Sequence, residues 1–125
     1  MKTLTIIMAI FSTSLLIAQQ KESKETMKST TMKTYLIARE MPGIGTLERA
    51  DLIGASQKSC SVLKEMGTGI EWKNSYVLDD MLYCVYKAEN KELIKEHAEK
   101  GGFPCDKIME IKTNIGPETA EEKVE

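Results

Sequence analysis

Residues 70–102, IEWKNSYVLDDMLYCVYKAENKELIKEHAEKGG, decide the fold because two strand-like segments and a helical segment follow one another directly. Residues 70–78 and 81–88 are short and rich in the β-branched and aromatic residues that favour strands. Asp79 and Asp80 between them predict a tight turn. The stretch therefore predicts an antiparallel hairpin that is followed at once by a helix.

Two helices are expected, and each has sequence signals at its ends. Asn90 is a favoured N-cap residue, and Gly101 is a common stop for the helix that begins after it. The other helix precedes the hairpin, with Thr46 as the expected cap and Gly67 as the expected stop. Its predicted buried face is the helical stripe Leu52, Ser56, Cys60, Leu63 and Met66.

Two further strands complete the domain, which we expect to span residues 32–115. Residues 33–40, KTYLIARE, predict the first strand, and residues 107–115, KIMEIKTNI, predict the last one. The resulting order, βαββαβ, is the split βαβ pattern of ferredoxin-like α+β domains. Right-handed crossovers then place both helices on one face of a four-stranded antiparallel sheet.

The segments outside the domain predict export. Residues 1–18 combine a positive Lys2 with an apolar run that ends at the small Ala18, which is typical of a secretory signal peptide. An uncleaved membrane anchor is the alternative. Residues 19–31 are polar and aperiodic and predict a flexible leader, and residues 116–125 predict a solvated acidic tail. We therefore expect a periplasmic or secreted protein that has no membrane association after signal cleavage.

The charge balance excludes one large class of partners. The chain has 17 basic and 19 acidic side chains, a net charge of −2 with histidine neutral. Cleavage after Ala18 removes only Lys2 from that balance. Nucleic-acid binding requires a basic surface, so we expect no nucleic-acid partner.

The strands have apolar residues on both faces, which predicts a homodimer. Ile70, Trp72 and Tyr76 are expected to share one face of their strand. In the next strand, Tyr83 and Val85 alternate with another apolar set, Leu82, Cys84 and Tyr86. Two helices can cover only one face of the sheet, so we expect a second copy of the chain to cover the other.

The three cysteines make an odd number, and their spacing contains no CxxC motif. Cys60 and Cys84 are predicted to be small core residues with free thiols. The layers of a sheet and its helices usually lie about 10 Å apart, too far for a disulfide between those two residues. Cys105 follows the last helix in a loop and is the cysteine most expected to be exposed.

His97 is the only histidine and is the centre of a possible metal site. In a ferredoxin-like fold its helix end, the end of the first strand and the hairpin turn lie at one end of the sheet. Glu40, Asp79 and Asp80 would then cluster with His97, in a donor set that suits a divalent ion such as nickel or zinc. The alternative is a structural histidine that is favoured by the end of its helix.

Four segments carry a resemblance to a known family, namely TYLIAREMPGIG (34–45), ASQKSCSVLKEMGTGIEW (55–72), SYVLDDMLYCVYKAEN (75–90) and LIKEHAEKGGFPCDKI (93–108). Together they resemble a small family of bacterial domains, formerly of unknown function, that covers nearly all of the predicted domain. The resemblance implies a dimeric ferredoxin-like fold and nickel binding. Two residues depart from the family pattern: Ala38 occupies a position where an acidic residue is expected, and Cys105 one where alanine is usual.

These observations favour an exported, non-enzymatic protein that binds a divalent metal, possibly nickel, as a homodimer. The first alternative is a small-molecule-binding protein or a cofactor-independent enzyme of the dimeric ferredoxin-like kind, with His97 as acid or base. Its pocket would lie between the sheet and the helices and would be lined by Tyr35, Trp72, Tyr76 and Tyr86. The second alternative is a purely structural or interaction module.

Overall fold

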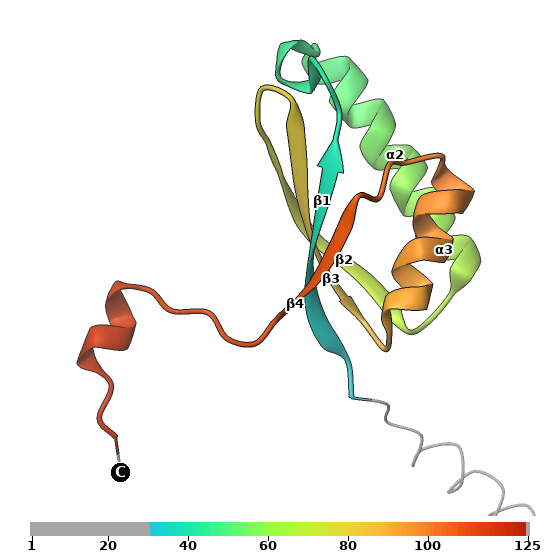
Figure 1. Ribbon diagram of the computed structural model, residues 1–125. Helices are drawn as coiled ribbons and strands as arrows, with labels where there is room; N and C mark the ends of the chain where they lie inside the picture. The colour runs from blue at the N-terminus through green and yellow to red at the C-terminus, as the bar shows by residue number, and fades with distance from the viewer. Residues whose placement is uncertain (1–30, 125) are drawn as a thin grey trace, which may run out of the picture. The chain divides into compact units, whose positions relative to one another are not determined.

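A computed structural model describes residues 31–124 and has the predicted βαββαβ order (Figure 1). Its elements are β1 (Lys33–Glu40), the 3₁₀ turn η1 (Ile44–Thr46), α2 (Arg49–Met66), β2 (Ile70–Val77), β3 (Met81–Ala88), α3 (Lys91–Gly101), β4 (Lys107–Ile111) and the 3₁₀ turn η2 (Pro117–Glu121). The predicted signal peptide, and all but the last residue of the predicted leader, lie outside the described residues. No helix within the described part of the chain is long and apolar enough to cross a membrane.

The four strands form one antiparallel sheet in the order β2-β3-β1-β4. The central strand β1 pairs with both β3 and β4, so Ile37 lies opposite Cys84 on one side and opposite Ile108 on the other. Both helices lie on the same side of the sheet (Figure 1). The prediction of a ferredoxin-like α+β fold is therefore confirmed.

The core lies between the sheet and the two helices. Alternate residues of β1 and β3 point into it, including Tyr35, Ile37 and Tyr86, and each is at most 3% exposed. From α3, Ile94 is fully buried against them. The period-2 alternation of the strands thus places their larger apolar side chains beneath the helices.

A β-bulge in β2 overturns one predicted face. Trp72 lies opposite Tyr86, but the next paired residue is Asn74 opposite Val85, so Lys73 is the extra residue. An inserted residue reverses the alternation beyond it. Tyr76 therefore shares no face with Trp72, and its side chain is 57% exposed on the side away from the helices.

The boundaries of the helices differ from the predictions at one end. α2 begins after Glu48, whose side chain makes no capping hydrogen bond, whereas Thr46 belongs to η1 and its hydroxyl donates to the carbonyl of Gly43. Gly67 ends α2 as expected. Asn90 is confirmed as the cap of α3, because its side-chain oxygen accepts the Leu93 N–H at 3.0 Å.

The buried face of α2 follows the predicted stripe except at Cys60, because Leu52, Ser56, Leu63 and Met66 are half-buried and the last two pack against the core. Ser59 and Val62 are its buried residues, and Cys60 is exposed. The placement of Cys60 in the core is therefore wrong, whereas Cys84 is buried and Cys105 is half-buried. All three thiols are free, as predicted for Cys60 and Cys84, and the exposed cysteine is Cys60 rather than Cys105, which the sequence had indicated.

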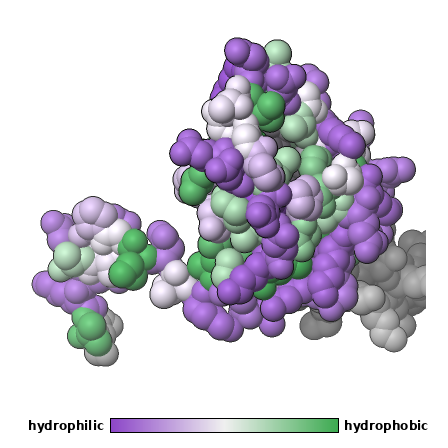
Figure 2. Space-filling model, turned by 45° about the horizontal axis from the view of Figure 1, so that its top comes forward, coloured by the Kyte–Doolittle hydropathy of each residue, from purple (hydrophilic) through white to green (hydrophobic). Residues whose placement is uncertain are grey.

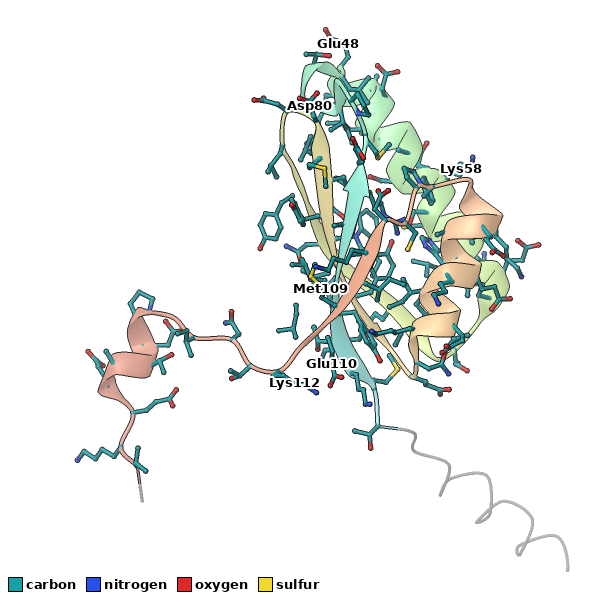
Figure 3. All side chains as sticks on the ribbon, in the orientation of Figure 1. Glu48, Lys58, Asp80, Met109, Glu110 and Lys112 are labelled. Atoms are coloured by element: carbon teal, nitrogen blue, oxygen red, sulfur yellow. The ribbon has the colours of Figure 1, made fainter. Side chains whose placement is uncertain are left out.

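The side of the sheet that faces away from the helices carries an apolar surface, here called the open face. From the strand register, it consists of Leu36, Ala38, Tyr76, Met81, Tyr83, Val85, Met109 and Ile111. Figure 3 shows Met109 on the side of β4 away from the helices. No helix or strand among residues 31–124 covers this face. Figure 2 shows apolar side chains at the surface of the domain, between hydrophilic ones.

Candidate functional site

The imidazole of His97 is fully buried where α3 packs against α2 and β3. Its Nε2 atom lies 3.1 Å from the hydroxyl oxygen of Ser59 on α2. That hydroxyl lies in turn 3.4 Å from the phenol oxygen of Tyr86 on β3. Three elements thus contribute one polar group each to a chain of contacts inside the core.

Two aromatic rings enclose the imidazole. The ring of Tyr86 is 5.3 Å from it at a tilt of 52°, and the ring of Phe103 stacks on it at 5.6 Å and 24°. Phe103 reaches this position because it packs over the last residue of α3, Gly101, where a Cβ atom would lie 2.3 Å from the ring. Gly101 is therefore required by the close approach of Phe103, whereas the glycine that ends α3 in the left-handed conformation is Gly102, one residue later than predicted.

Arg39 on β1 is the charged member of this cluster and is only 2% exposed. One terminal nitrogen, Nη1, donates a hydrogen bond to the carbonyl of Pro104, and the guanidinium lies 5.7 Å from the centre of the Phe103 ring. The other terminal nitrogen, Nη2, is buried and has no partner among residues 31–124. No carboxylate of those residues forms an ion pair with Arg39.

Burial and the nearby cation determine the protonation of the cluster. Burial lowers the pKa of His97, and the positive charge of Arg39 lowers it further. The imidazole is therefore neutral near pH 7, and its Nδ1 atom has no partner within the described part of the chain. Burial raises the pKa of Tyr86, whose phenol stays protonated and can donate a hydrogen bond.

A cavity of about 220 Å³ adjoins the cluster, between α2 and the sheet. Arg39, Ser59 and Tyr86 contribute polar groups to its lining, and Trp72 contributes an aromatic wall. The predicted pocket is thus present in part. Trp72 and Tyr86 line the cavity as expected, whereas Tyr35, Tyr76 and His97 do not belong to its lining.

The comparisons with known proteins agree with this fold. The model of the family described as "Nickel responsive protein SCO4226-like" matches residues 35–111, from β1 through β4. The chain belongs to this family. A crystal structure of SCO4226 from Streptomyces coelicolor A3(2) superposes with a TM-score of 0.56 at 18% sequence identity, covering 66% of this chain and 99% of that one. At that identity the likeness shows a shared fold. No curated protein sequence matches the chain.

Membership of the SCO4226-like family raises the question of where this chain could hold a metal ion. Within residues 31–124, no group of three or more His, Cys, Asp or Glu side chains is placed to bind one. The surroundings of His97 are two aromatic rings, a hydroxyl and the cation of Arg39. In this conformation the imidazole does not fit a metal site, because a cation there would face a like charge and no carboxylate.

The other predicted ligands lie at the expected end of the sheet but apart from His97. The Met41 N–H donates to the carbonyl of Asp80 at 2.9 Å, which joins the end of β1 to the hairpin turn. The side chain of Asp80 accepts the Gly43 N–H at 2.8 Å. All three acidic residues, Glu40, Asp79 and Asp80, are exposed. Figure 3 shows Asp80 at the tip of the hairpin.

Two members of the cluster were absent from the sequence-based site. Arg39 follows Tyr35 and Ile37 at intervals of two residues, so the alternation of β1 alone points it into the core. Its charge argues against that placement, because arginine is seldom fully buried without a partner. Ser59 lies next to Cys60, which is the more usual core residue, and has no sequence signal of its own.

Proposed function

We propose that the protein is an exported, non-enzymatic protein that binds a divalent metal of the nickel type as a homodimer. The observation that carries the proposal is the match of residues 35–111 to a family named for its response to nickel. The open face and the exposed carboxylates near one end of it supply the physical support. Export rests on the signal-like residues 1–18, and it predicts a secreted chain whose N-terminus begins after Ala18.

The open face supports the homodimer. It places eight apolar residues on one side of the sheet, and Tyr76 lies directly opposite Tyr83 within it. Large apolar surfaces of this kind are usually covered by a partner, and a two-fold interface uses the same surface on both copies. A second copy of the chain can therefore bury both tyrosines at once.

The same face supports a metal site that needs two chains. Glu40 lies opposite Met81 in the register, so it belongs to the side of the sheet that the open face occupies. Asp79 and Asp80 follow in the adjoining turn. One copy of the described chain provides too few ligands for a site, and a second copy on the open face would bring its own carboxylates to the interface. The carboxylates are therefore the favoured ligands in this conformation, and His97 would have to leave its buried position to join them.

The cluster around His97 supports a non-enzymatic function. The Ser59 hydroxyl is within hydrogen-bond distance of the imidazole, as in a nucleophile with its base. Such a pair needs a third group that orients the base, whereas Nδ1 of His97 has no partner in residues 31–124. Arg39 also disfavours the protonated imidazole that a general base must become. The pair is therefore better suited to joining α2 to α3.

Calorimetric titration of nickel, and then zinc, into the untagged chain of residues 19–125 tests metal binding. We expect binding at a defined ratio per dimer, and the absence of binding by either ion would contradict the proposal. Replacing Glu40, Asp79 and Asp80 by their amides should abolish tight binding. Amide replacement of Glu92, Glu96 and Glu99 on α3 removes the same charge and is the matched control. If His97→Gln lost binding and the carboxylate variant still bound the metal, the site would lie at His97.

Sedimentation of the same chain at micromolar concentration tests the dimer. Tyr83→Glu places a charge in the middle of the open face and should give a monomer. Ile53→Glu introduces the same charge at an exposed position of α2 and should leave the dimer intact. A monomeric wild-type protein, or a Tyr83→Glu variant that sediments as a dimer, would contradict an interface on the open face.

A further inference from the structure

We propose that the cavity between α2 and the sheet binds a small carboxylate with an apolar body, and that Arg39 anchors the carboxylate group. The cavity lies on the helix side of the sheet, whereas the proposed dimer and metal site lie on the open face. The two proposals therefore involve different residues and can fail independently.

The first argument is the electrostatics of Arg39. Burial of a guanidinium is costly unless its charge is paired and its N–H groups are hydrogen-bonded. Arg39 is 2% exposed, its Nη2 atom has no partner in the described chain, and no carboxylate of residues 31–124 pairs with it. A carbonyl and an aromatic ring compensate part of this cost. An anion bound in the cavity would supply the missing charge and the missing acceptor.

The second argument is the polar lining of the cavity. Two arginines line it, Arg39 and the exposed Arg49 at the start of α2, and none of the described lining residues is acidic. The hydroxyls of Ser59 and Tyr86 also belong to the lining. Because the Tyr86 phenol is held in its protonated form, it can donate to a second carboxylate oxygen. A carboxylate can therefore receive both a guanidinium and a hydroxyl in this cavity.

The third argument is the size and apolar character of the remaining walls. A cavity of about 150 Å³ is large enough for benzene, so the 220 Å³ found here can hold one aromatic ring or a short alkyl chain with a carboxylate. Apolar side chains surround most of it, including Met41, Ile44, Leu47, Leu52, Val77 and Leu82. Leu47 and Val77 are 45% and 44% exposed, so the cavity is open to solvent beside them. These walls favour an apolar body and disfavour a bare inorganic anion.

The single tryptophan makes the proposal measurable. Trp72 lines the cavity, and its ring nitrogen donates a hydrogen bond to the hydroxyl of Ser75 at 3.0 Å. A ligand bound in the cavity would lie beside the indole and should change the fluorescence of Trp72. The probe is phenylacetate at pH 7, titrated into the untagged chain of residues 19–125, with calorimetry as a second measurement. Phenylacetamide has the same shape without the charge, and acetate has the charge without the ring. We expect phenylacetate to bind at least about tenfold more tightly than either.

Two variants test the charge of Arg39 and the free volume of the cavity separately. Arg39→Met keeps an unbranched apolar side chain and removes the guanidinium, so it should weaken phenylacetate at least about tenfold while leaving phenylacetamide unchanged. Ser56→Phe fills the cavity and should abolish binding, whereas Ser61→Phe, at an exposed position of the same helix, should not. The Ser56 variant keeps the test decisive if Arg39→Met does not fold.

Three outcomes would overturn the proposal. Equal affinity for phenylacetate and phenylacetamide would exclude an anion anchored by Arg39. Equal affinity for acetate and phenylacetate would exclude the apolar body. Absence of binding by all three probes would leave Arg39 as a structural anchor of the Phe103–Pro104 loop. None of these results depends on nickel binding or on the dimer, which the carboxylate variant and the sedimentation experiment test separately.

Discussion

Nε2 of His97 lies 3.1 Å from Oγ of Ser59, in the interface between the two helices. This contact favours Ser59 over the predicted Cys60 as the buried residue of this turn of α2, because burying Ser59 gives the imidazole a polar partner. It also means that the chain's only histidine is a folding determinant as well as a candidate ligand.

Stability should depend on pH through His97. Burial and Arg39 keep its pKa in the folded protein below the usual 6.5, so the unfolded chain binds the proton more tightly. The stabilisation is therefore complete above about pH 6.5 and is lost as the pH falls below it, by at most about 1.4 kcal/mol per pH unit. Urea unfolding, followed by Trp72 fluorescence between pH 7 and 5, measures the slope. His97→Gln should flatten it, and an unchanged slope would show that other groups control this range.

Gly45 should be intolerant of substitution because the hairpin turn packs directly on it. A Cβ atom at this position would lie 2.8 Å from both the Cα of Asp79 and the carbonyl oxygen of Leu78. Gly45→Ala should therefore lower the free energy of unfolding by about 1–3 kcal/mol. Gly54→Ala is the matched control, since nothing lies within 4 Å of its Cβ and α2 should gain about 0.5–1 kcal/mol. Urea unfolding of both variants measures the difference, and equal effects would contradict the close approach.

Cys60 should react first with a thiol reagent. Its side chain is exposed, whereas Cys84 is 3% exposed and burial raises the pKa of the half-buried Cys105. Since the thiolate is the reactive form, native protein should show one fast thiol and two slow ones. Cys60→Ser should remove the fast phase, and Cys105→Ser should retain it. A fast phase that persists in Cys60→Ser would contradict the observed orientation of α2.

An acidic residue at position 38 should strengthen metal binding. The resemblance to the family predicts an acidic residue at position 38, and Ala38 lies two residues before Glu40 on the same face of β1. A third carboxylate beside the proposed ligands would raise the charge of the site, so Ala38→Asp should bind nickel about tenfold more tightly by calorimetry. Thr34→Asp, on the same face but at the other end of β1, is the control. Equal affinities in the two variants would place the metal elsewhere.

Local sequence signals were enough to predict the fold. The strand alternation, the Asn90 cap and the glycine after α2 are each determined by neighbours in the sequence, so they could be recognised directly. The bulge at Lys73 has no comparable signal, because neither glycine nor proline marks it and its effect is seen only in the pairing with β3. The predicted face of Tyr76 was wrong for that reason.

The candidate site was harder to predict because its members contact one another across the fold. The sequence identifies His97 and the carboxylates as possible ligands. It does not identify the partner of His97, because that partner depends on which residues of α2 face α3. The inward position of Arg39 follows from alternation, while its charge argues for the surface. Arg39 is buried because its guanidinium contacts Phe103 and Pro104, which lie 64 and 65 residues further along the chain.

The bulge at Lys73 also bears on how copies of this chain can associate without misassembling. β2 is an edge strand, and a regular edge with free N–H and carbonyl groups invites further strands and open-ended fibres. The extra residue interrupts that row of groups and twists the strand locally. The β2 edge is thereby protected against strand addition, and the proposed dimer uses the open face instead. Deletion of Lys73 would restore a regular β2 edge and should make the chain more prone to aggregation.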